Sequence, residues 1–172
     1  MKRPYIFVTI TLLMLVVDQA VKAWVRGAIP QHGSIRGLPF PGIFEITLQY
    51  NEGIAFGFLD GKGLFLSPVA IAIACGAGWY SFKHPNDSIL SHLSMGLLAS
   101  GALGNLYDRV VNGRVTDMFY FRAIRFPVFN VADSCITVAT ILLIATWFGE
   151  TAKQGKPQAA IAPESPNAGT DL

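Results

Sequence analysis

Two aspartates, Asp117 and Asp133, stand out as residues that could do chemistry in a strongly apolar chain. Asp133 lies near the start of an apolar run over residues 131–148, and an aspartate at the centre of a bilayer costs about 2.5–3.5 kcal/mol. Two carboxyl groups held close together cannot both ionise easily, so they share one proton. The ionised partner can take a proton from water while the protonated partner polarises a peptide carbonyl, a pairing that hydrolyses amides. A purely structural pair of acids is the alternative.

Other catalytic arrangements find less support in the sequence. A serine or cysteine nucleophile needs a nearby histidine, but His84 and His92 belong to the opposite end of the predicted spans, and His32 has no evident nucleophile beside it. The sequence shows no cluster of metal-ligand residues, so we expect neither a metal ion nor another cofactor. Four acids remain, all predicted near one membrane face: Asp18, Asp108, Asp117 and Asp133.

The composition predicts an integral membrane protein. Hydrophobic residues make up 52% of the chain and charged residues only 14%, against about 25% charged residues in a typical soluble domain. The formal charge of +2 gives no indication of a nucleic-acid partner. Cys75 and Cys135 each lie inside an apolar run, and we expect both to be small buried core residues.

Four apolar runs are long enough to cross a bilayer, which takes about 20 residues each. They cover residues 5–24, 63–82, 89–107 and 128–148. The first run follows Lys2 and Arg3 as in a secretory signal, but no convincing cleavage site follows it, so we interpret it as a retained span. We therefore expect a mainly α membrane protein with one four-helix domain over residues 1–150, and a disordered tail over residues 151–172.

The connections between the spans suggest a small sheet and an aromatic anchor. Residues 29–62 should be extramembrane, with an irregular, proline-containing first half, a strand over residues 44–50 and a second strand or bulge over residues 54–59. Between the third and fourth spans, dense aromatic residues alternate with Arg122 and Arg125, which is typical of a loop or short helix at the headgroup level.

The distribution of cations does not decide the orientation in the membrane. Four spans place both termini on one side, together with Lys2, Arg3, Lys83, Lys153 and Lys156. The opposite side carries Lys22, Arg26, Arg36, Lys62, Arg109, Arg114, Arg122 and Arg125, so counting runs against a cytoplasmic N-terminus. Several of these cations lie near acids and could be site residues instead of topology signals.

Five sequence blocks, in this order among four spans, resemble the bacterial lipoprotein signal peptidase (signal peptidase II) family. The blocks are Asp18-Gln19-Ala20-Val21-Lys22, Tyr50-Asn51-Glu52-Gly53-Ile54-Ala55-Phe56-Gly57, Gly104-Asn105-Leu106-Tyr107-Asp108-Arg109, Val115-Thr116-Asp117 and Phe129-Asn130-Val131-Ala132-Asp133-Ser134. The resemblance extends over residues 2–148 and leaves out only the tail.

The resemblance implies an inner-membrane aspartyl endopeptidase with cytoplasmic termini and a periplasmic active site. It also implies that the cyclic peptide antibiotic globomycin inhibits the enzyme. It implies cleavage of prolipoproteins just before a diacylglyceryl cysteine. We expect the acyl chains of the substrate to stay in the membrane lipid while the scissile bond lies at the membrane surface, where water can enter. We expect the protein to be a monomer that needs no cofactor. It makes Asp117 and Asp133 the catalytic dyad, with Asn51, Asn105, Arg109 and Asn130 orienting the dyad or the substrate. The spacing of Asp18 and Lys22 favours a helical ion pair, and we expect these two residues and Asp108 to give structural support, Asp108 through a helix-terminal salt bridge.

Two other classes of function stay open. A transporter or proton channel would need polar residues along the whole third span, which carries only His92, Ser91, Ser94 and Ser100. A non-catalytic assembly subunit would keep its function after both Asp117 and Asp133 are replaced.

Overall fold

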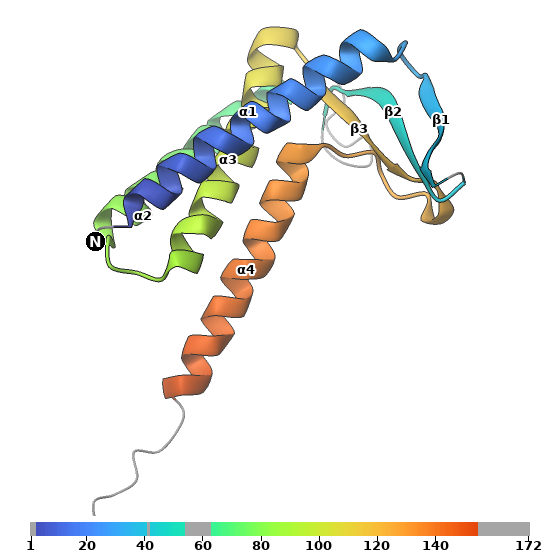
Figure 1. Ribbon diagram of the computed structural model, residues 1–172. Helices are drawn as coiled ribbons and strands as arrows, with labels where there is room; N and C mark the ends of the chain where they lie inside the picture. The colour runs from blue at the N-terminus through green and yellow to red at the C-terminus, as the bar shows by residue number, and fades with distance from the viewer. Residues whose placement is uncertain (1–2, 41, 54–62, 155–172) are drawn as a thin grey trace, which may run out of the picture.

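The computed structural model describes residues 3–40, 42–53 and 63–154, which form four long helices and one three-stranded sheet (Figure 1). The elements are α1 (Pro4–Ala28), β1 (Ser34–Phe40), β2 (Phe44–Asn51), η2 (Gly63–Leu66), α2 (Ser67–Lys83), α3 (Ile89–Asn112), β3 (Val115–Phe121), η3 (Arg122–Ile124) and α4 (Val131–Gln154). All four predicted spans are confirmed as helices long and apolar enough to cross a membrane. The protein is therefore a multi-pass membrane protein.

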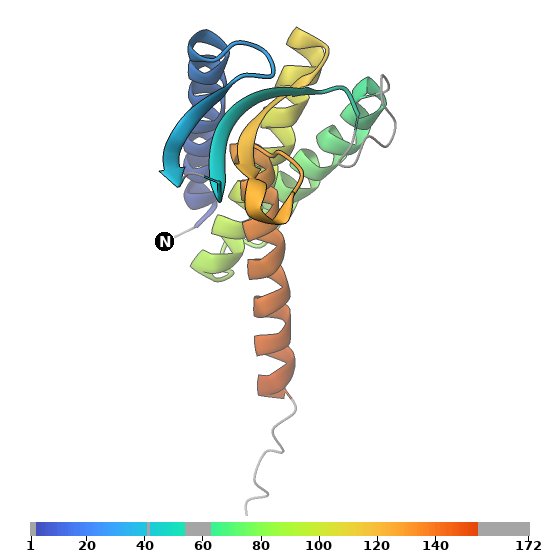
Figure 2. The same ribbon diagram turned by 90° about the vertical axis from the view of Figure 1, so that its right-hand side faces the viewer.

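Helix α3 is the centre of the bundle and contacts α1, α2 and α4. Small residues allow these close approaches, as is common between membrane helices. A Cβ atom added at Gly96 would lie 2.9 Å from Cβ of Ile10 on α1, and one added at Gly101 would overlap the backbone of Ala132 on α4. The second half of α4 extends away from the other helices (Figures 1 and 2), and its large apolar side chains are exposed, as expected beside lipid.

The sheet covers one end of the bundle, with antiparallel strands in the order β1-β2-β3 (Figure 2). Leu48 of β2 and Met118 of β3 are buried against Val25 and Ile29 at the end of α1. The first residues of α1 and the last residues of α4 both lie away from the sheet (Figure 1). The sheet therefore lies at the same end of the molecule as the helix ends that carry the polar side chains of the predicted site.

Two connecting segments differ from the sequence-based expectation. The proline-containing segment predicted to be irregular contains β1, which is an edge strand with a shift of register between Ile35 and Pro39, a position where proline is tolerated. The aromatic segment predicted as a loop or short helix is the strand β3, followed by the short helix η3. The strand predicted over residues 44–50 is confirmed, whereas residues 54–59 lie outside the described part of the chain.

Other expectations need smaller corrections. Helix α3 continues past residue 107 to Asn112 and ends at Gly113, which has a φ of 72°, so Asp108 and Arg109 lie within the helix and not after it. Cys135 is buried, but Cys75 is exposed on α2, because its side chain is on the surface where lipid would lie. Helix α4 continues to Gln154, and the remainder of the predicted tail, residues 155–172, lies outside the described residues.

Candidate active site

Both candidate aspartates line one cavity of about 630 Å³ between the sheet, α3 and the beginning of α4. Asp117 comes from β3, where it is 3% exposed, and Asp133 comes from the first turn of α4. The wall also includes apolar residues from the segment after η3 and from α4, among them Phe126, Phe129 and Val138. The fold thus brings the two carboxyl groups to one partly apolar cavity.

The side chain of Asn130 connects the two aspartates. Its Nδ2 donates to Oδ1 of Asp117 at 2.6 Å, and its Oδ1 accepts a hydrogen bond from the backbone N–H of Asp133 at 2.9 Å. The carboxylate of Asp133 in turn accepts from the backbone N–H of Asn130 at 3.2 Å. This reciprocal pairing of the residue before the helix with the third helical residue is a capping box. A local helix-start motif therefore fixes the position of Asp133 and ties it to Asp117.

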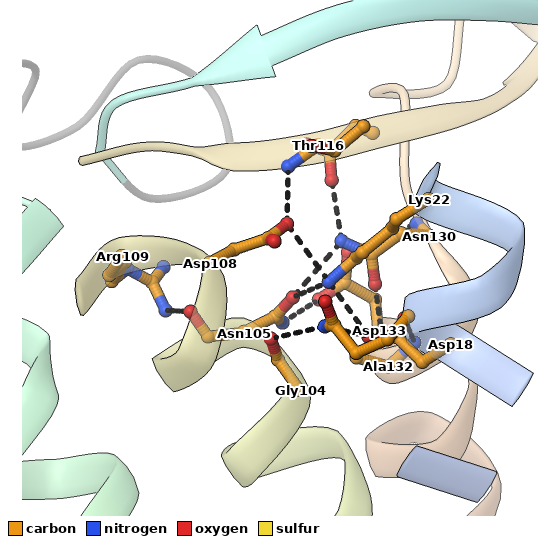
Figure 3. A network of polar contacts seen from close by, with 12 residues as sticks. Asp18, Lys22, Gly104, Asn105, Asp108, Arg109, Thr116, Asn130, Ala132 and Asp133 are labelled. Carbon is orange, nitrogen blue, oxygen red and sulfur yellow. Dashed lines mark hydrogen bonds and ion pairs between the residues drawn. The ribbon is translucent and has the colours of Figure 1, made fainter. Parts of the chain in front are cut away.

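Two further asparagines complete the coordination of the carboxylates. Asn105 on α3 donates from Nδ2 to Oδ1 of Asp133 at 2.8 Å, and Asn51 at the end of β2 donates from Nδ2 to Oδ2 of Asp117 at 3.2 Å. Figure 3 shows Asn105, Asn130 and Asp133 turned toward one another. Each carboxylate accepts from two amide donors, which restricts its orientation.

The two carboxyl groups lie in different electrostatic environments. Burial, reinforced by the nearby negative charge of Asp133, raises the pKa of Asp117 from 3.8 to about 7. Asp133 lies in the first turn of α4, where the helix dipole stabilises a negative charge. Near neutral pH the raised pKa keeps a proton on Asp117 far more often than on an ordinary aspartate.

Arg109 also lines the cavity, at the C-terminal end of α3. Within the described residues its guanidinium makes two long hydrogen bonds, from Nη2 to the carbonyl oxygen of Gly53 at 3.4 Å and from Nη1 to that of Asn105 at 3.5 Å. Its buried Nε has no hydrogen-bond partner among the described residues. Arg109 therefore has donor capacity that a bound ligand could use.

A buried ionic network lies behind the aspartates. The predicted pair of Asp18 and Lys22 is confirmed, with Oδ2 and Nζ 2.9 Å apart, and Lys22 also lies 3.3 Å from Oδ2 of Asp108. Asp108 is in addition paired with Arg26 at 3.4 Å. The three residues Asp18, Lys22 and Asp108 are almost completely buried, and Figure 3 shows them between α1, α3 and the start of α4.

The sequence analysis gave Arg26 and Thr116 no specific place in this network, although it counted Arg26 among the cations that could be site residues. The Arg26 guanidinium donates to Oγ1 of Thr116 at 2.9 Å as well as to Asp108. Arg26 follows Lys22 by four residues, just as Lys22 follows Asp18, so one helical face carries the sequence of acid, base and base. This i,i+4 spacing could have predicted the position of Arg26. For Thr116 the sequence gives no indication apart from its place before Asp117.

Comparison with known proteins decides the family. The family model described as Signal peptidase (SPase) II matches residues 10–149. The chain belongs to the signal peptidase II family. Relatives in this family include the lipoprotein signal peptidase of Streptococcus pneumoniae, 38% identical over 87% of this chain and 97% of the relative. The lipoprotein signal peptidase of Pseudoalteromonas translucida is 37% identical over 90% of this chain and 96% of its own.

Two solved structures share the fold of this signal peptidase II family member. One, described as a bacterial membrane enzyme at 2.3 Å resolution, has a TM-score of 0.79 and 29% identity over 87% of this chain and 92% of its own. The other, a bacterial membrane enzyme at 1.9 Å resolution, has a TM-score of 0.73 and 30% identity over 82% of this chain and 91% of its own. Family and fold together make the protein a membrane-embedded peptidase.

Proposed function

We propose that the protein is an aspartic endopeptidase that removes signal peptides from diacylglyceryl-modified prolipoproteins, cleaving just before the lipidated cysteine. The observation that carries the proposal is the placement of Asp117 and Asp133 on one cavity, with Asn130 hydrogen-bonded to both. The named relatives are lipoprotein signal peptidases, which supports this class of substrate.

The proposed reaction uses one water and the single proton of the dyad. Asp133 in its ionised form takes a proton from water as the water oxygen attacks the scissile carbonyl carbon. Asp117 gives its proton to the carbonyl oxygen, which yields a neutral tetrahedral diol. Collapse of the diol returns a proton to Asp117, while Asp133 delivers its proton to the leaving nitrogen and the C–N bond breaks. Arg109 orients the substrate, and Asn105 orients Asp133, the base.

The composition of the cavity wall supports a lipidated substrate. Phe126, Phe129 and Val138 line the cavity beside the aspartates, and the part of α4 below it is exposed and apolar. A diacylglyceryl substrate can approach sideways along α4 with its acyl chains still in lipid. We place the protein in the bacterial inner membrane as a monomer, with the site at the periplasmic face and both termini in the cytoplasm.

The experiment is cleavage of a purified diacylated precursor by the purified protein, with and without globomycin. We expect Asp117→Asn and Asp133→Asn each to lower the rate by about a thousandfold or more, because a triad- or dyad-type mechanism loses its proton transfer. Asp87→Asn, an acid-to-amide change in the loop at the far end of the bundle, is the matched control and should cleave at the normal rate.

Membrane insertion and elution as a folded species must be checked for each variant. Normal cleavage by either dyad variant that inserts correctly would refute the aspartic mechanism. Failure of the unmodified protein to cleave any diacylated precursor would refute the proposed substrate class.

A further inference from the structure

Lys22 occupies a singular position in the site: its buried ammonium contacts three polar side chains at once. Nζ lies 2.9 Å from Asp18, 3.3 Å from Asp108 and 3.1 Å from Oδ1 of Asn105, to which it donates. Asn105 then donates from its amide to Asp133 at 2.8 Å. Figure 3 shows Lys22 reaching from α1 into the centre of this group. Lys22 is therefore one side chain removed from the dyad.

The two acids that pair with Lys22 each hold the backbone just before a dyad aspartate. Oδ1 of Asp18 accepts from the backbone N–H of Ala132, the residue before Asp133, at 2.9 Å. Oδ2 of Asp108 accepts from the backbone N–H of Thr116, the residue before Asp117, also at 2.9 Å. Asp18 and Asp108 thus form a second pair of carboxylates behind Asp117 and Asp133, and Lys22 is ion-paired with both.

The charges around the dyad can be counted from every element that meets there. Besides Asp117 on β3 and Asp133 on α4, the charged or titratable groups are Asp18, Lys22 and Arg26 on α1, Asp108 and Arg109 on α3, the exposed Glu52 after β2, and the neutral thiol of Cys135 on α4. Apart from the exposed Glu52, three cations face four carboxyl groups among the residues that the structure describes. Four carboxylates and three cations carry one net negative charge, so this set is neutral with one proton. We assign that proton to the dyad because Asp18 and Asp108 are already ion-paired, and an uncompensated charge in a largely buried site is costly.

We propose that Lys22 is a positioning residue for the reaction: as the shared counter-ion of Asp18 and Asp108, it sets the charge balance that leaves a single proton on the Asp117–Asp133 pair. This inference rests on the proposed function, because it concerns the protonation state in which the dyad can act. Without the ammonium, the same four acids face two cations, and the neutral state requires two protons. With Asp18 made neutral instead, three acids face three cations, and the neutral state requires none.

The two variants Lys22→Gln and Asp18→Asn break the same ion pair but change the charge in opposite directions. A dyad that needs exactly one proton gives a bell-shaped dependence of kcat on pH. In Lys22→Gln both the acidic and the basic limb of this pH–rate profile should move to higher pH, by about one unit, since a cation near an acid has been removed. In Asp18→Asn both limbs should move to lower pH. The double variant Lys22→Gln/Asp18→Asn should return toward the profile of the unmodified protein.

The measurement is the initial rate of cleavage of a diacylated precursor from pH 5 to pH 9, with thermal unfolding of each variant recorded in the same detergent. If Lys22 serves only to hold the helices together, both single variants lose rate without displacement of either limb, and that result overturns the proposal. Shifts of the same sign in both variants overturn it as well. Should Lys22→Gln not fold, Asp18→Asn and the charge-balanced double variant still decide between these outcomes.

The proposed function and this inference fail in different ways. If the unmodified protein does not cleave the precursor, the function is refuted. If it cleaves and the dyad variants are inactive, but the limbs stay in place when Asp18 or Lys22 is changed, only the role assigned to Lys22 is lost.

Discussion

Asp117 combines deep burial with a second carboxyl group on the same cavity, and these two conditions make its negative charge expensive. The amides of Asn130 and Asn51 and the positive charge of Lys22 oppose this effect without cancelling it, and the pKa of Asp117 stays raised at about 7. The protonated carboxyl that general acid catalysis requires is therefore present at physiological pH. Function at this residue conflicts with stability, because the folded state must hold a proton that the unfolded chain releases.

The stability of the protein should consequently fall as the pH rises from about 4 to about 7. Between its ordinary pKa of 3.8 and its raised pKa of about 7, Asp117 binds more protons in the folded state than in the unfolded state, so the free energy of unfolding decreases with pH. Over this window the contribution is at most about 4 kcal/mol, at 1.36 kcal/mol per pH unit. Below pH 4 and above pH 7 it no longer changes.

Asp117→Asn removes this titration and so tests it. The unfolding temperature of the inactive variant, relative to that of the unmodified protein, should increase from pH 4 to pH 7 and then stay level. Asp87→Asn, at the loop between α2 and α3, is the control that should show no such trend. A constant difference in unfolding temperature between Asp117→Asn and the unmodified protein at all pH values would contradict the raised pKa.

At the scale of elements, the sequence predicts the helices better than the strands. Each apolar run carries enough information for a span, because length and hydropathy alone decide insertion. Strand β3 is different: its aromatic residues suit the headgroup zone, so they are predicted as part of a loop or short helix, and pairing with β2 makes the segment a strand. Strand pairing is non-local, so a sequence read segment by segment gives little sign of it.

The candidate site shows the same division between local and distant contacts. The i,i+4 spacing of Asp18 and Lys22 predicts their ion pair, which the structure confirms. The contacts of Lys22 with Asn105 and Asp108 join α1 to α3 across more than eighty positions of the chain, and no spacing rule predicts them. The resemblance to a family named these residues, but their arrangement around one ammonium needed the fold.

The close packing of α3 against α1 should hold this ionic network in place, and Gly104 of α3 lies directly against Asp18 of α1. A Cβ atom added at Gly104 would lie 2.6 Å from Oδ2 of Asp18 and 3.3 Å from Cβ of Ala132. Gly104→Ala should therefore push Asp18 from its position between Lys22 and α4. Because buried charge is involved, we expect a loss of about 2–4 kcal/mol in stability and at least a tenfold loss in cleavage rate.

Gly76→Ala on α2 is the matched control for Gly104→Ala. Apart from the backbone of α2 itself, no atom of the described residues lies within 4 Å of a Cβ added there. The change should therefore leave activity intact and stabilise the helix slightly, as alanine is the better helix former. Unfolding temperature and cleavage rate are the two readouts. Equal effects of the two substitutions would show that the contact between Gly104 and Asp18 has no special importance.

At the scale of the whole molecule, the structure explains why the cation count was ambiguous. Several cations at the sheet end are already matched with acids: Lys22 with Asp18 and Asp108, Arg26 with Asp108, and Arg122 with Glu45 at 2.7 Å. The placement of these three cations is set by their contacts in the site and the sheet, so they are weak indicators of membrane orientation. Without these three, five cations remain on each side of the membrane, so the count favours neither orientation. From the proposed function we infer that the sheet faces the periplasm.

Labelling of single cysteines from one side of the membrane tests this orientation. In a background with Cys75→Ser and Cys135→Ala that still cleaves the precursor, Ala123→Cys introduces an exposed thiol beside the sheet, and Lys83→Cys introduces one at the opposite end of α2. A membrane-impermeant maleimide added to spheroplasts should label the cysteine at position 123 and leave that at position 83 unlabelled until the membrane is opened. A permeant maleimide should label both, which controls for reactivity. Because the dyad is at the sheet end, the reverse pattern would place the active site on the cytoplasmic side. The bond to be cleaved in an exported lipoprotein precursor would then lie on the other side of the membrane from the dyad.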